Sequence, residues 1–330
     1  MQQLKLVIPK GSLGERTLKL FSEANYAIKG DDRTYRPYIN DPELSVKILR
    51  PQEIPSLVEQ GAHDIGISGE DWIRESQSDV EILTKLEYGH VKIVLAVPEI
   101  WEDVKSFSDL VRKFFVEGTS LRISTEYINT VTEYILKNEE YKERFGDKKP
   151  LVITPWGKSG ENPSVILQLS FGATESKPPE DADAIIDNTE TGTTIRANNL
   201  KIIEQIGDSQ AVLLANMESL KDPWKREKMS DVLTLLQGVV DARKRLHIFM
   251  NVKEENVNIL LATLPALKRP TISPLAEEGW VALNTVIPRD LFIELIPKLR
   301  KLAQGLVVHT PRQVLSLEEI RKLNTFKSDK

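Results

Sequence analysis

The chain has 330 residues, a formal net charge of −5 and a hydrophobic content of 40%. This length exceeds what one hydrophobic core comfortably supports, so we expect two or three domains. The negative net charge argues against a general nucleic-acid-binding or anionic-membrane surface. The chain contains no cysteine, which excludes disulfides, thiolate metal sites and cysteine nucleophiles, and its four histidines argue against a histidine-rich metal site.

The amino terminus reads directly into a strand, without the charged segment and long apolar segment of a signal peptide. No uninterrupted apolar run approaches the ~20 residues that a membrane-spanning helix needs. We therefore expect a cytoplasmic protein that binds neither nucleic acid nor membrane.

The first strand is predicted at 4–8 and ends at Pro9. A turn with Lys10 and Gly11 follows, and a helix capped by Ser12 is expected to begin near Gly14. This strand, loop and helix form a candidate anion site with Lys10 at its mouth, although a Lys-Gly turn after a strand is more commonly only a turn.

Two further strands are predicted in the first hundred residues, at 44–49 and 63–69. The first ends at Arg50, and the second runs into a glycine turn that carries Asp71. Arg33 and Arg50 lie next to strand ends, where α/β proteins bind ligands. An isolated arginine is nevertheless more commonly solvated or salt-bridged.

A strongly β-type run at 90–97 stops at Pro98, and we expect the chain to cross into a second domain after Val97. The elements predicted beyond it are helices at 107–115 and 129–137 and strands at 121–124, 151–154 and 184–186. Residues 138–150 are highly charged, and 156–163 read as a loop.

The chain is expected to return before an apolar strand at 211–215, and helical periodicity follows at 221–245. Short strands that alternate with helices, with polar loops at the strand ends, predict α/β layers with mostly parallel sheets.

The last part of the chain has the order strand, helix, strand, strand, helix, strand. The strands are predicted at 247–252, 270–274, 280–287 and 305–309, and the helices at 255–264 and 291–302. This βαββαβ order is the ferredoxin-like arrangement, which is often used to bind small regulators and to pair subunits. No catalytic constellation occurs in it.

The stretch at 182–200 combines a short buried strand, a polar loop from Asp187 to Thr194, and a predicted helix from Ile195 onward through 206. The first N–H groups of a helix lack intrahelical partners, so such a strand, loop and helix can bind an anion. The hydroxyls of Thr191, Thr193 and Thr194 add donors to the same anion.

Two acids, Asp187 and Glu190, stand beside this phosphate cradle. Carboxylates repel a phosphate at this range unless they serve something else, such as sugar hydroxyls or a metal ion. A ligand with both a phosphate and a ribose fits the mixture, and phosphoribosyl diphosphate is the obvious one. The alternative is a capped helix start after a strand, with solvated acids.

Motifs along the whole chain resemble those of the ATP phosphoribosyltransferase family in its long form. P-K-G-S-L at 9–13 resembles the family's P-K-G-R-L, and D-I-G-I-S-G-E-D at 64–71 resembles D-L-G-I-T-G-x-D. The segments 48–61 and 86–98 are similar to an arginine followed by D-I-P-x-x-V-x-x-G and to L-x-x-G-x-x-K-L-V-x-A-V-P.

The stretch D-N-T-E-T-G-T-T-I-R-A-N-N-L at 187–200 nearly matches the family's phosphoribosyl-diphosphate signature, D-x-V-E-T-G-T-T-L-R-A-N-G-L. In the last third, R-P-T-I-S-P-L at 269–275 and G-W-V-A at 279–282 resemble the long-form regulatory domain. Each motif alone is weak, whereas this many in the correct order is a strong signal.

The resemblance implies an α/β catalytic part built like a two-domain, hinged solute-binding protein of type II, with the active site in the cleft, followed by a ferredoxin-like regulatory domain. It implies a catalytic domain I at 1–96 and 208–244, a catalytic domain II at 97–207 that carries the phosphoribosyl-diphosphate loop, and a histidine-binding domain at 245–330. Dimers that assemble into hexamers are implied as well.

The chemistry that the resemblance implies is the condensation of ATP with 5-phosphoribosyl 1-diphosphate, the first step of histidine biosynthesis. Mg²⁺ is implied as cofactor, mainly through the substrate phosphates. The implied catalytic residues are Asp187, Glu190 and Lys10. Phosphoribosyl-diphosphate binding is implied for Asp187, Glu190, Thr191, Gly192, Thr193 and Thr194, and ATP binding for Lys10, Gly11, Arg33, Arg50, Asp71 and Glu175. Feedback inhibition by histidine is implied through Asn251, Thr271 and Ser273.

The chain departs from the family's pattern in three places. Ser12 stands where an arginine is common, Asn188 and Thr189 replace an apolar pair, and the segment 139–163 is longer and more charged. Two other functions remain open: a hinged solute-binding protein that recognises an anion without chemistry, and an inactive regulatory homologue. The lack of an export signal argues against the first, and the intact threonine loop argues against the second.

Overall fold

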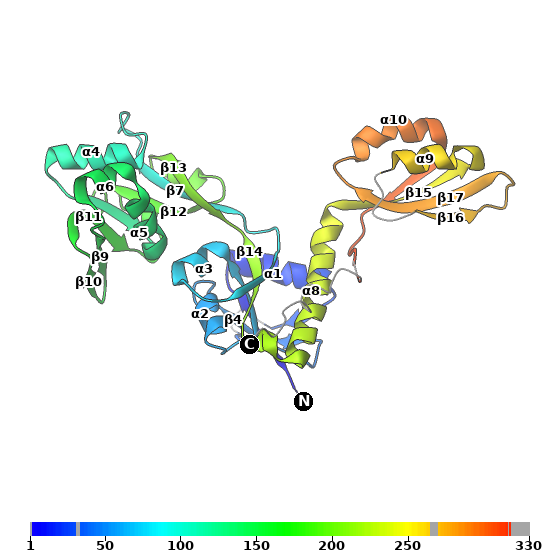
Figure 1. The fold of residues 1–330 in the computed structure, drawn as a ribbon, viewed down its shortest axis with the longest axis horizontal. Helices are drawn as coiled ribbons and strands as arrows, with labels where there is room; N and C mark the ends of the chain where they lie inside the picture. Colours follow the sequence, from blue (N-terminus) through cyan, green and yellow to red (C-terminus); the bar gives the residue numbers. More distant parts are fainter. Residues whose placement is uncertain (1, 31–33, 265–269, 316, 318–330) are drawn as a thin grey trace. The chain divides into compact units, whose positions relative to one another are not determined.

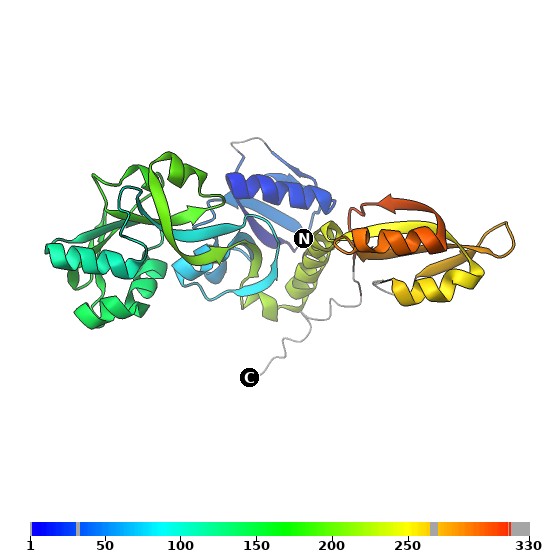
Figure 2. The same cartoon turned by 90° about the horizontal axis from the view of Figure 1, so that it is seen from above.

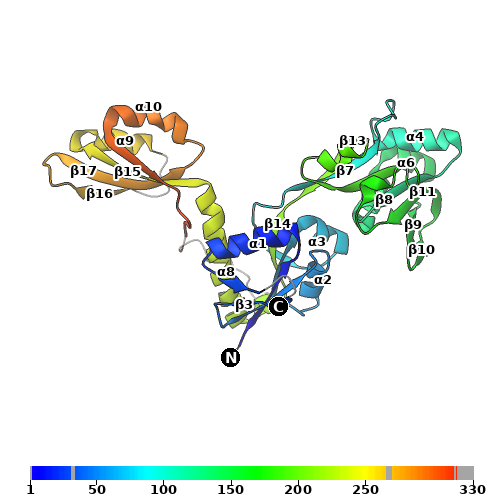
Figure 3. The ribbon, with the colours of Figure 1, turned by 180° about the vertical axis from the view of Figure 1, so that it is seen from behind.

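The computed structural model describes residues 2–30, 34–264, 270–315 and 317, and Figures 1 to 3 show the fold from three sides. Within these ranges the strands form sheets of five, seven, four and two members. The chain divides into two compact units, one of Met1–Lys5, Glu15–Lys47 and Glu218–Lys330 and one of Leu6–Gly14 and Ile48–Met217.

The five-stranded sheet has the order β4-β1-β5-β14-β6. Its strands are β4 (Leu44–Leu49), β1 (Leu4–Pro9), β5 (Ile65–Gly69), β14 (Ala211–Ala215) and β6 (Glu81–Lys85). β1 and β5 are parallel, and β14 is antiparallel to both of its neighbours. Every residue of β14 is buried, which explains its uninterrupted apolar sequence.

Three helices follow strands of this sheet along the chain, namely α1 (Ser12–Glu23), α2 (Ile54–Glu59) and α3 (Glu70–Ser76). The loops before α1 and α2 carry Lys10 and Arg50, and Asp71 lies in the first turn of α3. A separate two-stranded sheet pairs β2 (Ile28–Lys29) with β3 (Tyr38–Ile39).

The seven-stranded sheet has the order β10-β9-β11-β8-β12-β7-β13. Its strands are β10 (Gly157–Ser159), β9 (Pro150–Thr154), β11 (Asn162–Leu169), β8 (Leu121–Thr125), β12 (Ala184–Thr189), β7 (Val91–Pro98) and β13 (Leu200–Ser209). β9, β11, β8 and β12 run parallel, so the loops that follow β8, β11 and β12 meet at one edge of the sheet.

Helices α4 (Phe107–Glu117), α5 (Ile128–Lys137) and α6 (Glu139–Phe145) pack against this sheet (Figure 1). Fully buried aromatic side chains such as Phe107, Tyr127 and Tyr141 fill the interface with the strands. α4 and α6 lie side by side (Figures 1 and 3), and Arg112 Nε donates to Glu140 Oε2 at 2.9 Å between them. The charged segment at 138–150 is thus mainly a helix.

Residues 200–209 form a strand, so the helix that we predicted from Ile195 through 206 is wrong. Helix α7 spans only Thr193–Ala197, and β13 pairs antiparallel with β7. The register shifts between Ile202 and Glu204 and again between Gln205 and Gly207. Each bulge adds a residue and interrupts the strand period of two, and the resulting apolar spacing imitates a helix.

The point at which the chain passes from the five-stranded sheet to the seven-stranded sheet also differs from our expectation. β7 already pairs with β12 and β13 in the seven-stranded sheet, so the chain leaves the five-stranded sheet before Val91 and not after Val97. A strand that is buried on both faces carries no sequence signal for which sheet it joins. Sequence reasoning also missed β6, β11 and the short β10, which lies inside the predicted loop at 156–163.

The C-terminal part has the predicted βαββαβ order. It contains β15 (Arg245–Lys253), α9 (Val257–Thr263), β16 (Thr271–Pro274), β17 (Trp280–Pro288), α10 (Phe292–Leu302) and β18 (Ala303–His309). The antiparallel sheet has the order β16-β17-β15-β18, and both helices cover the same face of it (Figures 1 and 2). Alternate residues of β15, including Ile248 and Met250, point into the core beneath the helices.

The long helix α8 (Pro223–Arg243) leads into this part, and Asp222 caps it by accepting a hydrogen bond from the Lys225 N–H at 3.1 Å. Short 3₁₀ turns complete the described elements, at Thr174–Ser176, Ser219–Lys221 and Glu254–Asn256. α1 and α8 lie side by side (Figure 3), and Arg243 pairs with Glu23 at 2.8 Å.

After β18 the chain returns to these two helices. Arg312 Nε donates to the carbonyl of Glu23 at 3.0 Å, and the N–H of Val314 donates to the carbonyl of Gly238 at 2.9 Å. Leu315 lies close to Gly238 in the middle of α8: a Cβ at Gly238 would be 2.2 Å from Leu315 Cδ2, so a larger residue there would displace the leucine side chain. We call residues 310–315 the return segment.

Candidate active site

A pocket of about 310 Å³ lies where β12 ends. Its lining residues come from the loop after β11, from β12 and from the start of α7: Thr174, Glu175, Ile185, Asp187, Asn188, Thr189, Glu190, Thr191, Thr193, Thr194 and Ile195. The volume is that of a small-ligand site. The structure thus brings together five of the six residues predicted to bind phosphoribosyl diphosphate, along with Glu175 from the predicted ATP set.

Gly192, the sixth residue, forms the turn into α7 with φ +73°. Its N–H donates to Thr189 Oγ1 at 2.8 Å, and the hydroxyls of Thr191 and Thr193 lie 2.8 Å apart. A Cβ at Gly192 would lie 3.0 Å from Arg196 Nη1, so the backbone angle and the neighbouring side chain both favour glycine. These contacts order the loop.

Helix α7 has only five residues. A helix this short aligns few peptide dipoles, so it is not an anion site by itself. The donors that this loop offers to an anion are therefore mainly the hydroxyls of Thr191, Thr193 and Thr194.

Asp187 is held in place within β12, two residues before the strand ends. Its Oδ2 accepts a hydrogen bond from Thr174 Oγ1, and its Oδ1 accepts one from the Asn188 N–H at 2.7 Å. Burial raises the pKa of the Asp187 carboxyl, and the negative charge of Glu175 adds to this, while the bonds from Thr174 and Asn188 act in the opposite direction. A partly desolvated, fixed carboxylate is a strong acceptor for hydroxyl donors.

Glu126 is a residue near the pocket that sequence reasoning missed. It follows β8 directly, and burial raises its pKa, with the charge of Asp187 as the second cause. A hydrogen bond with Gln52 and the positive charge of Arg50 lower the pKa of Glu126. Glu126 therefore faces both the Asp187 pocket and the loop after β4, and its place after a parallel strand was the available signal.

The predicted residues of the five-stranded sheet lie at its strand ends. Lys10 and Gly11 are exposed after β1, where the Lys10 N–H donates to the carbonyl of Leu49 at 2.7 Å, and Arg50 is exposed after β4. Arg33 lies outside the described residues.

Asp71 differs from these residues because it is only 4% exposed. Its Oδ1 accepts a hydrogen bond from Ser209 Oγ at 2.7 Å, and its Oδ2 accepts one from the Tyr127 hydroxyl at 2.8 Å. Both carboxylate oxygens thus already have protein partners, and the ATP contact expected for Asp71 stays a prediction.

Asn251, Thr271 and Ser273 share the exposed face of the four-stranded sheet. Ala282 pairs with Asn251 on one side and with Ser273 on the other, and Thr271 pairs with Asn284 two residues further along β17. Residues paired across strands point to the same face, and all three predicted side chains are exposed. Their role in binding histidine stays a prediction.

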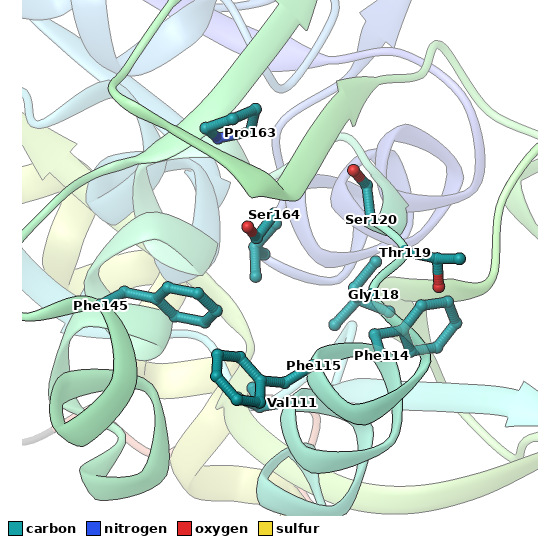
Figure 4. Close-up of a pocket in the computed structure, with 11 residues that line it drawn as sticks. Val111, Phe114, Phe115, Gly118, Thr119, Ser120, Phe145, Pro163 and Ser164 are labelled. Atoms are coloured by element: carbon teal, nitrogen blue, oxygen red, sulfur yellow. The ribbon is translucent and has the colours of Figure 1, made fainter.

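A second pocket, of about 260 Å³, lies at the opposite ends of β8 and β11 (Figure 4). The rings of Phe115 and Phe145 face each other across it, and Phe114 and Ser164 also line it. No charged side chain lines it. This pocket therefore lacks the charge pattern expected for phosphorylated substrates.

Within the described ranges, no group of three or more His, Asp or Glu residues is arranged to hold a metal ion. No helix in the part of the chain that the structure describes is both long and apolar enough to cross a membrane.

Comparison with known proteins decides the family. The family signature "ATP phosphoribosyltransferase" (HisG) matches residues 50–238, and the signature of the HisG C-terminal domain matches residues 242–310. The chain belongs to the ATP phosphoribosyltransferase family. It carries the C-terminal domain of the long form, and it is a pentosyltransferase.

The sequence of this transferase is similar to those of individual relatives over most of its length. It is 39% identical to the ATP phosphoribosyltransferase of Pelodictyon phaeoclathratiforme over 91% of this chain and 93% of the relative. It is 38% identical to that of Pelotomaculum thermopropionicum over 94% of this chain and 98% of the relative.

Among solved structures, the transferase is similar to a chain of the ATP phosphoribosyl transferase (HisG:HisZ) complex from Thermotoga maritima. The TM-score is 0.53 at 23% identity, with 72% of this chain and 99% of that chain covered. This likeness shows a shared fold, so the predicted fold class is confirmed: an α/β catalytic part followed by the family's C-terminal domain.

Proposed function

We propose that this transferase condenses ATP with 5-phosphoribosyl 1-diphosphate to give N1-(5-phosphoribosyl)-ATP and diphosphate, the first step of L-histidine biosynthesis. The observation that carries the proposal is the pocket at the end of β12. It combines carboxylates of Asp187 and Glu190 with hydroxyls of Thr191, Thr193 and Thr194 in one small volume. A phosphorylated ribose needs both kinds of partner.

In the reaction, N1 of adenine attacks C1 of the ribose, and the bond from C1 to the diphosphate oxygen breaks. The electron pair of that bond leaves with the diphosphate, so positive charge develops on the sugar and negative charge on the leaving group. N1 carries no proton, so no general base is needed for the attack. The contribution of the protein is positioning and electrostatic stabilisation.

The proposed roles follow from the chemistry of each side chain. Thr191, Thr193 and Thr194 donate to the 5-phosphate, while Asp187 and Glu190 accept hydrogen bonds from the ribose hydroxyls and so orient C1. The fixed position of Asp187 between Thr174 and the Asn188 N–H supports this assignment, because an acceptor already in place loses little entropy on binding.

Positive charge for the diphosphate and for ATP is proposed to come from Lys10, Arg33 and Arg50, with Gly11, Asp71 and Glu175 as further ATP-side residues. Glu126 is proposed as a further residue on the ATP side, because it lies near both Arg50 and Asp187. Mg²⁺ is proposed to reach the site on the substrate phosphates, because Mg²⁺ is commonly bound through substrate phosphates and one or two carboxylates. When bound, it neutralises diphosphate charge.

We also propose a cytoplasmic location and a homo-oligomer in which dimers assemble into hexamers. Histidine is proposed as a feedback inhibitor that binds through Asn251, Thr271 and Ser273. The three residues share one exposed sheet face. Replacing Ser273 by valine should raise the histidine concentration for half-inhibition about fivefold, the effect of one hydrogen bond, with the uninhibited rate unchanged. Unchanged inhibition in this variant and in Asn251→Leu would contradict the proposal that histidine binds this face of the sheet.

One assay tests the reaction. The protein is incubated with ATP, 5-phosphoribosyl 1-diphosphate and Mg²⁺, and the formation of phosphoribosyl-ATP is followed in the ultraviolet, before and after histidine is added. Binding of both substrates without product would instead support the alternative, a non-catalytic anion-binding or regulatory homologue.

A further inference from the structure

A chain of hydrogen bonds runs from the end of β5 to the pocket. It begins at Asp71, whose Oδ1 accepts from Ser209 Oγ at 2.7 Å and whose backbone N–H donates to the same Oγ at 3.0 Å. Tyr127 follows, with its hydroxyl 2.8 Å from Asp71 Oδ2, and Asn188 completes the chain, with its Nδ2 2.7 Å from the Tyr127 oxygen. The first three of these side chains are buried, and Asn188 is exposed and lines the pocket.

The charge at one end of this chain fixes the direction of every bond in it. The Asp71 carboxylate only accepts, so Tyr127 must give its one proton to Asp71. The Tyr127 oxygen can then only accept, so Asn188 must offer it the NH₂ side of the amide. Burial and the charge of Asp71 raise the pKa of Tyr127 well above its usual range, so the phenol keeps this proton at working pH.

The remaining group of Asn188 is its carbonyl oxygen, which cannot exchange places with the NH₂ without breaking the bond to Tyr127. Asn188 lies directly after Asp187, and both line the same pocket. We infer that Asn188 is a further substrate-binding residue, whose carbonyl oxygen accepts a hydrogen bond from a ribose hydroxyl, and that Asp71 and Tyr127 are its positioning residues. This inference rests on the proposed function of the pocket.

The packing around Tyr127 supports a positioning role. Its ring stacks on Trp72 with centroids 4.8 Å apart. Beside it, Glu75 of α3 accepts hydrogen bonds from the N–H groups of Asn129 and Thr130 at 2.9 and 3.0 Å, at the start of α5. The Tyr127 ring therefore has a fixed place, and a fixed hydroxyl gives Asn188 a fixed orientation.

An apolar side chain in place of Asn188 would neither accept from a sugar hydroxyl nor bond to the buried phenol of Tyr127.

The test measures the affinity of 5-phosphoribosyl 1-diphosphate and of its 2-deoxy and 3-deoxy analogues by calorimetry, with ATP omitted so that nothing turns over. Asn188→Leu is expected to weaken binding of the intact ligand about three- to tenfold, the effect of one hydrogen bond, and to leave the affinity for one deoxy analogue unchanged. Tyr127→Phe should act in the same direction, and the double variant should bind no more weakly than Asn188→Leu, because the two side chains act as one unit.

Steady-state kinetics separate positioning from general damage. Tyr127→Phe should raise the KM for 5-phosphoribosyl 1-diphosphate and leave kcat within about twofold, because the lost contact acts in the ground and transition states alike. Tyr141→Phe is the matched control. Tyr141 is equally buried, donates to the Lys148 carbonyl at 2.6 Å and accepts from Asn162 Nδ2 at 2.9 Å, but it does not line the pocket. The Tyr141→Phe variant should have a lower Tm, but its preference for the intact ligand over the deoxy analogues should not change.

The outcomes are distinguishable. The inference is overturned if Asn188→Leu and Tyr127→Phe both bind the three ligands with the same ratios of affinity as the wild type. The proposed function would stand in that case. Failure of the wild-type protein to bind 5-phosphoribosyl 1-diphosphate overturns both.

Discussion

The loops after β1 and after β12 both join a strand to a helix through a glycine, yet they offer different chemistry to an anion. The first carries Lys10 and starts the 12-residue helix α1. The second, together with the adjoining residues of β12 and α7, carries three threonines and two acids and leads into the five-residue helix α7. One loop supplies a full positive charge, and the other supplies hydroxyls beside carboxylates.

Because of this difference, the two loops would hold a phosphate group in different ways. A lysine charge acts over several ångströms, tolerates small displacements and is screened by salt. Hydroxyls act only at hydrogen-bond distance, so they fix the position of what they bind. Under the proposed function, the β12 loop would hold the ribose phosphate in place, and the β1 loop would attract a more mobile polyphosphate.

The largest effect is expected from the acids beside the threonine loop. Glu190→Gln should lower turnover roughly 10- to 100-fold, because an acceptor with a full negative charge is replaced by a neutral one. The rate of phosphoribosyl-ATP formation measures this, and circular dichroism checks that the fold survives. Wild-type turnover in this variant would contradict the role assigned to Glu190.

The next effect should come from the basic loop. Lys10→Met is expected to lower kcat/KM about tenfold at low salt, and the loss should shrink as salt rises, because the lysine charge is screened. Lys158→Met is the control, since Lys158 is an exposed lysine on β10. Equal salt dependence in both variants would show that Lys10 makes no specific contact.

A smaller effect is expected from a single hydroxyl. Thr193→Val keeps the shape of the side chain and should weaken binding of 5-phosphoribosyl 1-diphosphate about fivefold by calorimetry, with little change at higher salt. Thr119→Val, in the pocket of Figure 4, should leave this affinity unchanged. If the Thr193 variant binds as tightly as the wild type, the phosphate does not lie on this loop.

The smallest effect concerns stability. Burial raises the pKa of Asp187, so the folded protein binds this proton more tightly than the unfolded chain does. The free energy of unfolding therefore falls as pH rises from the ordinary Asp value of about 3.9 through the raised one. Asp187→Asn removes this cost, so its Tm should exceed that of the wild type at pH 7, and the difference should vanish at low pH. A lower Tm at pH 7 would mean that the carboxylate stabilises the fold.

Much of the pocket was predictable because its residues are contiguous. Asp187, Glu190 and the three threonines lie within eight residues after a buried strand, so local sequence alone places them together. Glu126, Tyr127 and Thr174 come from other loops, and only the parallel order of β11, β8 and β12 brings those loops to β12. That order depends on long-range pairing, which has no local signal.

The fold shows the same division between local and long-range information. The βαββαβ part was predicted largely because its two longest strands, β15 and β17, alternate regularly between buried and less buried residues. β13 was mistaken for a helix because two bulges interrupt the alternation, and bulges depend on the partner strand.

The return segment has a consequence for protein engineering. Because residues 310–315 bind back to α1 and α8, the strands and helices of 245–309 form an insertion and not a terminal extension. A stop codon after Leu246 would remove the return segment as well, and with it the hydrogen bond from Val314 to Gly238 and the contact of Leu315 with α8. Arg289 contacts both ends of the insertion, through its N–H to the Lys244 carbonyl at 2.8 Å and its Nη2 to Thr310 Oγ1 at 3.4 Å. A short linker from Lys244 to Thr310 would therefore excise the insertion and keep the return segment in contact with α1 and α8.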